Sequence, residues 1–261
     1  MPPTANNDRY AEHALPDDFP ISTLGSLREK IIAPGGAFDP QRTWTQTFRI
    51  YNNGPNSSAV GKLVIERRAG PGQKVSLKVR HEKMLSGATH VRSGGGARRV
   101  LDAVLQVGPE PSELSTPRTW SFTTKVFDND GSAIPDLSLK RTAAVKNGTL
   151  RVTTGNGSPR KYDLPGKYTV CWALFDAVAR LPRERFDPIA FTLIDHFDQV
   201  KPDQTLVFRR TIETTIGGKK VRLHGYDQTG RGIMPFTYWI DHQGRTVAAI
   251  SGLEAYLLET A

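Results

Sequence analysis

Hydrophobic and polar residues alternate with a period of two through most of the chain, a pattern typical of β-strands with one buried face. The segment Lys74–Glu82 shows it most clearly, because Val75, Leu77 and Val79 alternate there with polar side chains. Strands that are buried on one face belong to antiparallel sheets with one solvated side. The pattern therefore predicts a mainly β protein with an antiparallel sheet.

Similar runs follow one another at short spacing and predict a long meander. The turns between them include Asn147-Gly148 and Gly217-Gly218, which suit tight hairpins because both central positions tolerate a positive φ. The predicted strands are 43–52, 61–69, 74–82, 98–107, 120–127, 137–145, 149–154, 190–197, 204–216, 219–226, 236–240, 246–251 and 255–258.

One segment in mid-chain has the period of a helix instead. Within Val170–Leu181 the residues Val170, Leu174 and Val178 form one apolar stripe, and Pro182 ends the segment. Only two of these residues are charged. We therefore expect a helix that is buried on most of its circumference.

The N-terminal region differs from the rest of the chain. Residues 1–20 are polar and rich in Pro and Asn, and Ile21–Ile32 has apolar residues at helical spacing. We predict a leader with a short helix over 1–42 and a single antiparallel β domain over 43–261. A polar start without an apolar leader run is typical of a mature exported chain, and a cytoplasmic location stays open.

Composition excludes several kinds of site. The single cysteine, Cys171, excludes an intrachain disulfide framework and a cysteine-rich zinc site. No apolar run is long enough to form a transmembrane helix. The common signatures of nucleotide-binding loops, serine hydrolases and zinc proteases are also missing, so we expect no cofactor and no bound metal.

The net charge of +9 is concentrated in one region. Residues 62–99 contain ten basic residues and two acidic ones. Such a face attracts anionic surfaces or ligands, although lysines on a solvated strand face also discourage edge pairing. Three arginines beside a run of glycines, Arg92, Arg98 and Arg99, are candidate anion-binding residues. Nucleic acid is an unlikely partner, because exposed aromatic residues do not interleave with the charges.

The order of elements resembles the lipoprotein-carrier (Lol-type) half-barrels and similar uncharacterised bacterial envelope families. The segments that carry the resemblance are 190–206 (AFTLIDHFDQVKPDQTL from residue 190) and 235–258, where an aromatic Tyr-Trp pair precedes an Asp-x-x-Gly-Arg turn. The resemblance implies a meander curved into a half-barrel, with one apolar helix packed on its concave side. It also implies that an acyl chain or another apolar ligand lies between the sheet and the helix.

Aromatic side chains are available to line such a cavity. The candidate lining residues are Trp172, Phe175 and Val178 on the predicted helix, with Tyr238 and Trp239 on a closing strand. The alternative is that these rings form an ordinary filled core. An empty space between them distinguishes a carrier from a core.

Acid/base chemistry has weak candidates on the late strands. They are Asp195, His196, Asp198 and Asp241. Adjacent strand residues point to opposite faces, so Asp195 and His196 cannot act as one unit on a regular strand, whereas His196 and Asp198 can share a face.

His81 is in phase with the buried residues of its strand. We expect it to point inward with its hydrogen bonds satisfied rather than to bind a ligand.

Three functions remain open from the sequence. The first is a non-enzymatic binding protein for an apolar or amphipathic small molecule or lipid, with basic residues favouring an anionic head group or surface. The second is a metal-dependent or acid/base hydrolase that uses the late-strand Asp and His residues. The third is an interaction scaffold without a cavity.

Overall fold

The computed structural model describes residues 27, 29–52, 58–70, 72, 74–85, 97–108 and 113–260. Within these residues the chain forms fifteen strands, one α-helix and short 3-10 turns. The strands are β1 Trp44–Asn52, β2 Ala59–Ala69, β3 Val75–Leu85, β4 Ala97–Val107, β5 Pro117–Phe127, β6 Leu139–Lys146, β7 Thr149–Thr154, β8 Arg160–Asp163, β9 Tyr168–Val170, β10 Ile189–Asp195, β11 Gln199–Ile216, β12 Lys219–Gly230, β13 Phe236–Asp241, β14 Thr246–Ser251 and β15 Glu254–Thr260. The helical elements are η4 Pro135–Leu137, η5 Cys171–Ala173 and α1 Leu174–Val178.

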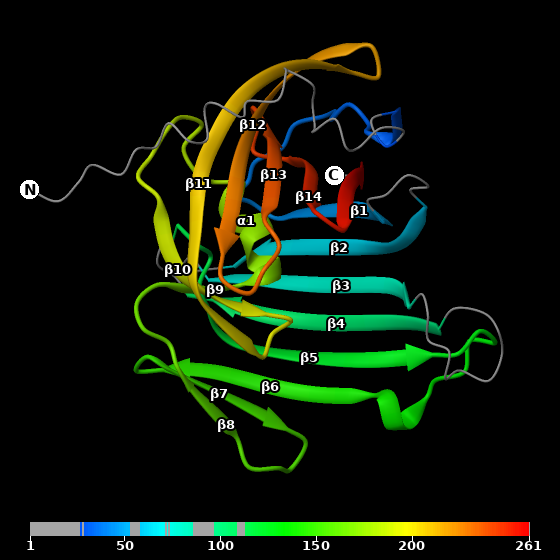
Figure 1. Cartoon of the computed structure of the whole chain (residues 1–261), viewed down its shortest axis with the longest axis vertical. Helices are drawn as coiled ribbons and strands as arrows, with labels where there is room; N and C mark the ends of the chain where they lie inside the picture. The colour runs from blue at the N-terminus through cyan, green and yellow to red at the C-terminus, as the bar shows by residue number, and fades with distance from the viewer. Residues whose placement is uncertain are drawn as a thin grey trace, which may run out of the picture.

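All fifteen strands belong to one open sheet (Figure 1). Its order is β8-β7-β6-β5-β4-β3-β2-β1-β15-β14-β13-β12-β11-β10-β9, so the first and last strands of the domain are neighbours. Each pair is antiparallel except β9 with β10. The predicted antiparallel meander is confirmed. The sequence prediction missed the short strands β8 and β9, whose few residues give too little alternation to recognise.

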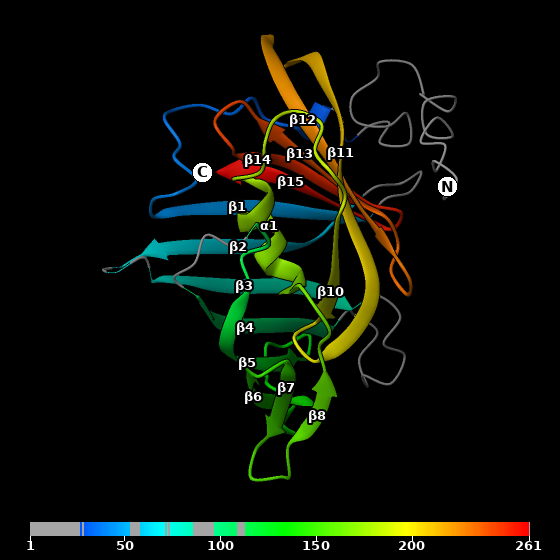
Figure 2. The same cartoon turned by 90° about the vertical axis from the view of Figure 1, so that its left-hand side faces the viewer.

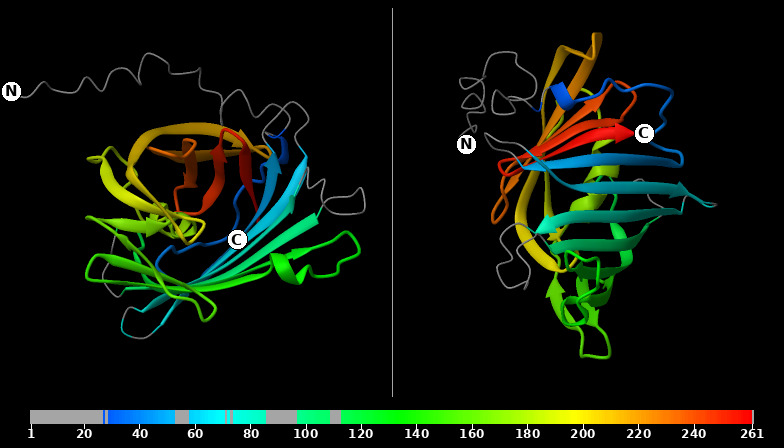
Figure 3. Two further views of the ribbon diagram at one scale, coloured as in Figure 1. Left: turned by 60° about the horizontal axis from the view of Figure 1, so that its bottom comes forward. Right: turned by 90° about the vertical axis from the view of Figure 1, so that its right-hand side faces the viewer.

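The sheet curls so that its two ends approach each other (Figure 3). The turn between β10 and β11 bridges them. Phe197 in this turn is fully buried, stacks on Phe122 of β5 at 5.2 Å between ring centroids, and accepts a 3.0 Å hydrogen bond from the indole N–H of Trp120. Asp198 also forms an ion pair with Arg141 of β6. These contacts give the sheet its barrel-like form.

The helix lies against the concave face of the sheet (Figure 2) and is shorter than predicted. The prediction of one helix over Val170–Leu181 is wrong at its start, because Val170 pairs with β10 as the last residue of β9. The chain then passes through η5 into α1, and every residue of α1 is buried. The expectation of a helix buried around its circumference is confirmed.

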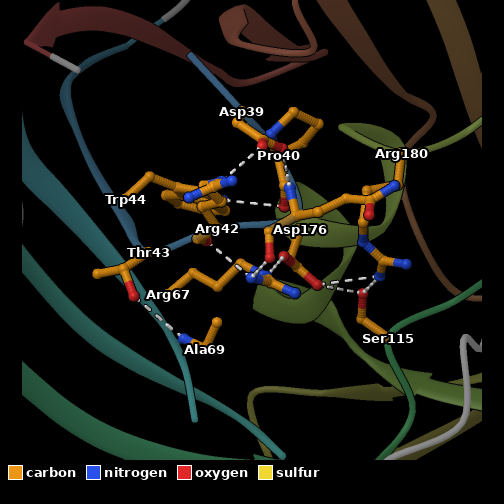
Figure 4. Close-up of polar contacts among 11 residues, drawn as sticks. Asp39, Pro40, Arg42, Thr43, Trp44, Arg67, Ala69, Ser115, Asp176 and Arg180 are labelled. Atoms are coloured by element: carbon orange, nitrogen blue, oxygen red, sulfur yellow. Dashed lines mark hydrogen bonds and ion pairs between the residues drawn. The ribbon is translucent and has the colours of Figure 1, made fainter. Parts of the chain in front are cut away.

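A buried ionic cluster fixes α1 to the sheet (Figure 4). Asp176 of α1 is 1 % exposed, and its carboxylate lies 2.9 Å from the Nε of Arg67 on β2 and 3.0 Å from Arg180. The hydroxyl of Ser115 donates a 2.5 Å hydrogen bond to the same carboxylate. Arg67 also donates to the carbonyl of Arg42 at 2.7 Å. Three separate segments of the chain therefore meet at Asp176, and Arg67 connects them to a fourth.

A second, smaller core covers the outer face of the sheet. Leu27 and Ile31 pack there against Trp239 and the outward-facing residues of β14 and β15. In the described part of the predicted helix over 21–32, residues 27, 29 and 30 are in 3-10 conformation and residues 31 and 32 have no regular secondary structure. Residues 1–26 and 28 of the predicted leader and helix lie outside the described residues. Over the part of the chain that is described, no helix has the length and hydrophobicity needed to span a bilayer.

Candidate ligand-binding cavity

A cavity of about 550 Å³ lies between the start of the helical segment and the concave face of the sheet. The helical segment contributes one wall, and strands from both halves of the sheet contribute the others. Its interior is aromatic and its mouth carries charged residues. The residues that line it are His81, Lys83, Arg99, Cys171, Trp172, Phe175, Leu193, Asp195, His196, Lys201, Gln228, Gly232, Ile233, Met234, Phe236, Tyr238, Ser251, Leu253, Glu254 and Tyr256.

Aromatic rings from the helical segment and the sheet pack against one another and line the cavity. Phe175 meets Tyr238 edge-on at 5.4 Å between ring centroids, and Trp172 meets Tyr256 edge-on at 6.0 Å. Phe236 lies 4.9 Å from Tyr238. These edge-to-face contacts are the geometry that aromatic pairs prefer. They form a preorganised apolar surface on one side of the cavity.

His81 lies inside the cavity without a hydrogen-bonding partner. It is 2 % exposed, its ring lies 4.9 Å from that of Trp172, and both ring nitrogens lack a partner among the described residues. Burial, with the nearby charges of Arg99, His196 and Lys83, lowers the pKa of His81 to about 3. The imidazole is therefore neutral near pH 7, with one nitrogen able to donate and the other able to accept.

The prediction for His81 is thus half correct. It points inward as expected, but the expectation of satisfied hydrogen bonds is wrong, because neither ring nitrogen has a hydrogen-bonding partner among the described residues. The indole N–H of Trp172 is also buried without a partner. By contrast, the indole N–H of Trp120 donates to a backbone carbonyl at 3.0 Å. Buried polar groups are normally hydrogen-bonded, so these two unpaired groups make the cavity the candidate site.

The mouth of the cavity carries both signs of charge. The ammonium of Lys201 lies 2.6 Å from the carboxylate of Asp195, and Lys83 is paired with Glu254. Arg99 has no ion pair with any described residue, and its Nε is buried without a partner. Burial and the charge of Arg99 together lower the pKa of Lys83.

One side of the mouth is formed by the strained turn between β10 and β11. His196 and Phe197 have φ angles of 46° and 71°, a left-handed conformation that costs non-glycine residues roughly 1–2 kcal/mol each. The buried contacts of Phe197 hold the turn in place. The side chain of His196 is about half exposed in this turn. Partial burial of its ring lowers the pKa of His196, and the negative charge of Asp195 opposes this by raising it.

Of the predicted lining residues, Trp172, Phe175 and Tyr238 line the cavity. Val178 does not, because it lies one turn further along α1 in the filled core. Trp239 does not line it either. Adjacent strand residues point to opposite faces, so when Tyr238 faces the cavity Trp239 faces the outer core.

The predicted acid/base residues do not converge. Asp195 and His196 lie at the cavity mouth, with 4.0 Å between the carboxylate and Nε2, whereas Asp198 is paired with Arg141 outside it. Asp241 lies at the far end of β13, where its carboxylate accepts backbone hydrogen bonds within its own turn. Among the described residues, no three His, Cys, Asp or Glu side chains are grouped to hold a metal ion.

The three predicted anion-binding arginines are separated in the structure. Arg99 lines the cavity, whereas its neighbour Arg98 points to the other face of β4 and donates a 2.5 Å hydrogen bond to Glu82. Arg92 lies outside the described residues. Strand alternation explains the split, because consecutive residues cannot share a face.

Several lining residues were not predicted. Lys83 and His81 are two apart on β3, and Glu254 and Tyr256 are two apart on β15, so each pair shares a face. The period of two was visible in the sequence. It did not show that β15 pairs with β1, which brings these strands to the same cavity.

Comparison with known proteins adds evidence on the fold. No family model matches the chain, and no curated protein matches it. A crystal structure of a beta-barrel-like protein of domain of unknown function DUF1849, from Brucella abortus, is similar with a TM-score of 0.57. The likeness covers 84 % of this chain and 97 % of that chain at 12 % sequence identity. The fold of this chain is therefore similar to that of the beta-barrel-like protein. At this identity the likeness is one of fold alone.

A second hollow of about 800 Å³ lies beside the other end of α1. It is lined by Arg67, Asp176 and Arg180, among others. The one buried carboxylate there, that of Asp176, already forms ion pairs with both arginines. The aromatic cavity differs because its buried polar groups are unpaired, and it is therefore the stronger candidate site.

Proposed function

We propose that this chain is a non-enzymatic binding protein that holds one apolar or amphipathic molecule between its curved sheet and its helix. The observation that carries the proposal is the aromatic cavity with an unpartnered histidine inside it. Ligand pockets are typically apolar clefts with a few polar groups that orient the ligand. The cavity has both features.

An interaction scaffold without a cavity accounts less well for these features. Protein interiors are close-packed, and an open space among five aromatic residues forgoes packing contacts unless something occupies it. An unpaired buried imidazole has a further cost of roughly 1–3 kcal/mol. Both costs favour a site kept for a ligand.

Hydrolysis is supported less well than binding. The carboxylate of Asp195 is already paired with Lys201, and Asp241 lies far along the sheet. Cys171 also lines the cavity, but burial raises the pKa of its thiol well above the usual range. A protonated thiol is a poor nucleophile.

The proposal predicts that a heavy-atom ligand quenches one particular tryptophan. The chain has four tryptophans, and only Trp172 lines the cavity. Titration with 12-bromododecan-1-ol, whose bromine quenches indole fluorescence on contact, is expected to reduce the emission to a plateau. The quenching should disappear in Trp172→Phe.

Trp239→Phe is the matched control, because Trp239 lies on the next strand position but faces the outer core. This variant should retain the saturable quenching. Quenching that persists unchanged in Trp172→Phe, or that never saturates in the unaltered protein, would contradict the proposed site.

A further inference from the structure

Two cations face each other at the mouth of the cavity. Lys83 of β3 and Arg99 of β4 are directly opposite in the register of this antiparallel pair, and both line the cavity. Directly opposite side chains have Cβ atoms roughly 5 Å apart, and like charges in that position are destabilising. The partial burial of both side chains strengthens the repulsion, because it reduces solvent screening.

The protein compensates only one of these charges. Glu254 of β15 forms an ion pair with Lys83 and also accepts a 2.7 Å hydrogen bond from the hydroxyl of Tyr256. Asp195 is taken by Lys201. The three cations at the mouth therefore outnumber the two carboxylates, and Arg99 is left without an ion pair among the described residues.

The unpaired polar groups lie close to this uncompensated charge. His81 is two residues before Lys83 on the same face of β3, and the charge of Arg99 acts on its ring. Its ring is 2 % exposed and has no partner among the described residues. A guanidinium and a neutral imidazole N–H together provide donors for the oxygens of an anion.

Apolar residues continue from these donors into the cavity and around its mouth. Met234 and Leu253, which are 47 % and 65 % exposed, line the opening, and the aromatic rings line the interior. The cavity volume of about 550 Å³ limits the size of the ligand. A water-sized group of atoms occupies roughly 30 Å³, so the cavity accommodates about eighteen such groups. That is the size of one alkyl chain with a head group, not of a two-chain lipid.

We infer that the ligand is a single-chain amphiphile with an anionic head group, a carboxylate or phosphate held by Arg99 and His81, with its tail among the aromatic rings. This inference rests on the proposed function and adds the class of ligand to it. The anion completes the charge balance at the mouth, and one of its oxygens accepts a hydrogen bond from the imidazole N–H.

Calorimetric titrations with four C12 probes, each below its micelle concentration, test the inference. Sodium dodecanoate and dodecyl phosphate carry anionic head groups, dodecan-1-ol is neutral and dodecylammonium is cationic. We expect at least one of the two anions to bind about tenfold or more tightly than the alcohol, and the ammonium to bind most weakly. Whichever anion binds better identifies the head group.

Substitution of Arg99 tests the assigned contact. Arg99→Gln should remove the advantage of the anion over the alcohol, and Arg99→Lys should restore part of it. Arg98→Gln is the matched control, because Arg98 faces the other side of the sheet. This substitution should leave all four affinities unchanged. Urea unfolding of each variant identifies any that fail to fold.

The possible failures are distinguishable. Equal binding of the anions and the alcohol, or an anion preference that survives in Arg99→Gln, would overturn the anionic head group while leaving the binding function intact. Binding of none of the four probes would overturn the proposed function as well.

Discussion

Replacing Asp176 with asparagine is expected to lower the free energy of unfolding by about 3–5 kcal/mol. The carboxylate lies 2.9 Å from the Nε of Arg67, which is itself 7 % exposed. Removal of the negative charge leaves a buried guanidinium without its counterion, and such an uncompensated charge has a large desolvation cost. Urea denaturation followed by far-UV circular dichroism measures the change.

Asp102→Asn is the control for this experiment. Asp102 pairs with Arg80 on the outer face of the sheet, where both side chains are more than half exposed. Exposed pairs contribute at most about 1 kcal/mol. A destabilisation by Asp176→Asn no larger than that of Asp102→Asn would contradict the role of the buried cluster in fixing α1.

Replacing His81 with leucine is expected to make the ligand-free protein more stable and the ligand complex weaker. The two side chains have similar volumes, and the substitution removes two unpaired nitrogens from an aromatic environment. We expect the free energy of unfolding to rise by about 1–3 kcal/mol. Dodecanoate affinity should fall by about tenfold, because one hydrogen bond to the head group is lost.

His224→Leu is the matched control. His224 is also largely buried, but its Nδ1 lies 2.9 Å from the hydroxyl of Thr211. Its replacement should lower the free energy of unfolding by about 1 kcal/mol, because it leaves a hydrogen bond unmade. If His81→Leu destabilises the protein as His224→Leu does, His81 is a structural histidine and not part of a binding site.

The strands were predictable because the alternation is a local property of the sequence. In Lys74–Glu82 each residue reports its own face, and the observed strand Val75–Leu85 contains nearly the same residues. The helix was less predictable. The apolar stripe included Val170 and Leu181, but pairing with β10 takes Val170 into a strand, and the helical segment begins only at Cys171.

The candidate site was predictable only in part, for a related reason. Tyr238 and Trp239 were both predicted to line the cavity, yet alternation places them on opposite faces and does not tell which of them faces the helix. It placed His81 inside without revealing its neighbours. Those neighbours come from β15 and the β10–β11 turn, and their proximity depends on pairings between distant parts of the chain.

The central claim is that one amphipathic molecule occupies the aromatic cavity. Native mass spectrometry of the purified protein after incubation with a total bacterial lipid extract tests it most directly. We expect a single adduct with one molecule bound per chain, which releases a single-chain anionic amphiphile detected in negative-ion mode. A chain that stays bare throughout, or that binds several lipids without saturation, would contradict it.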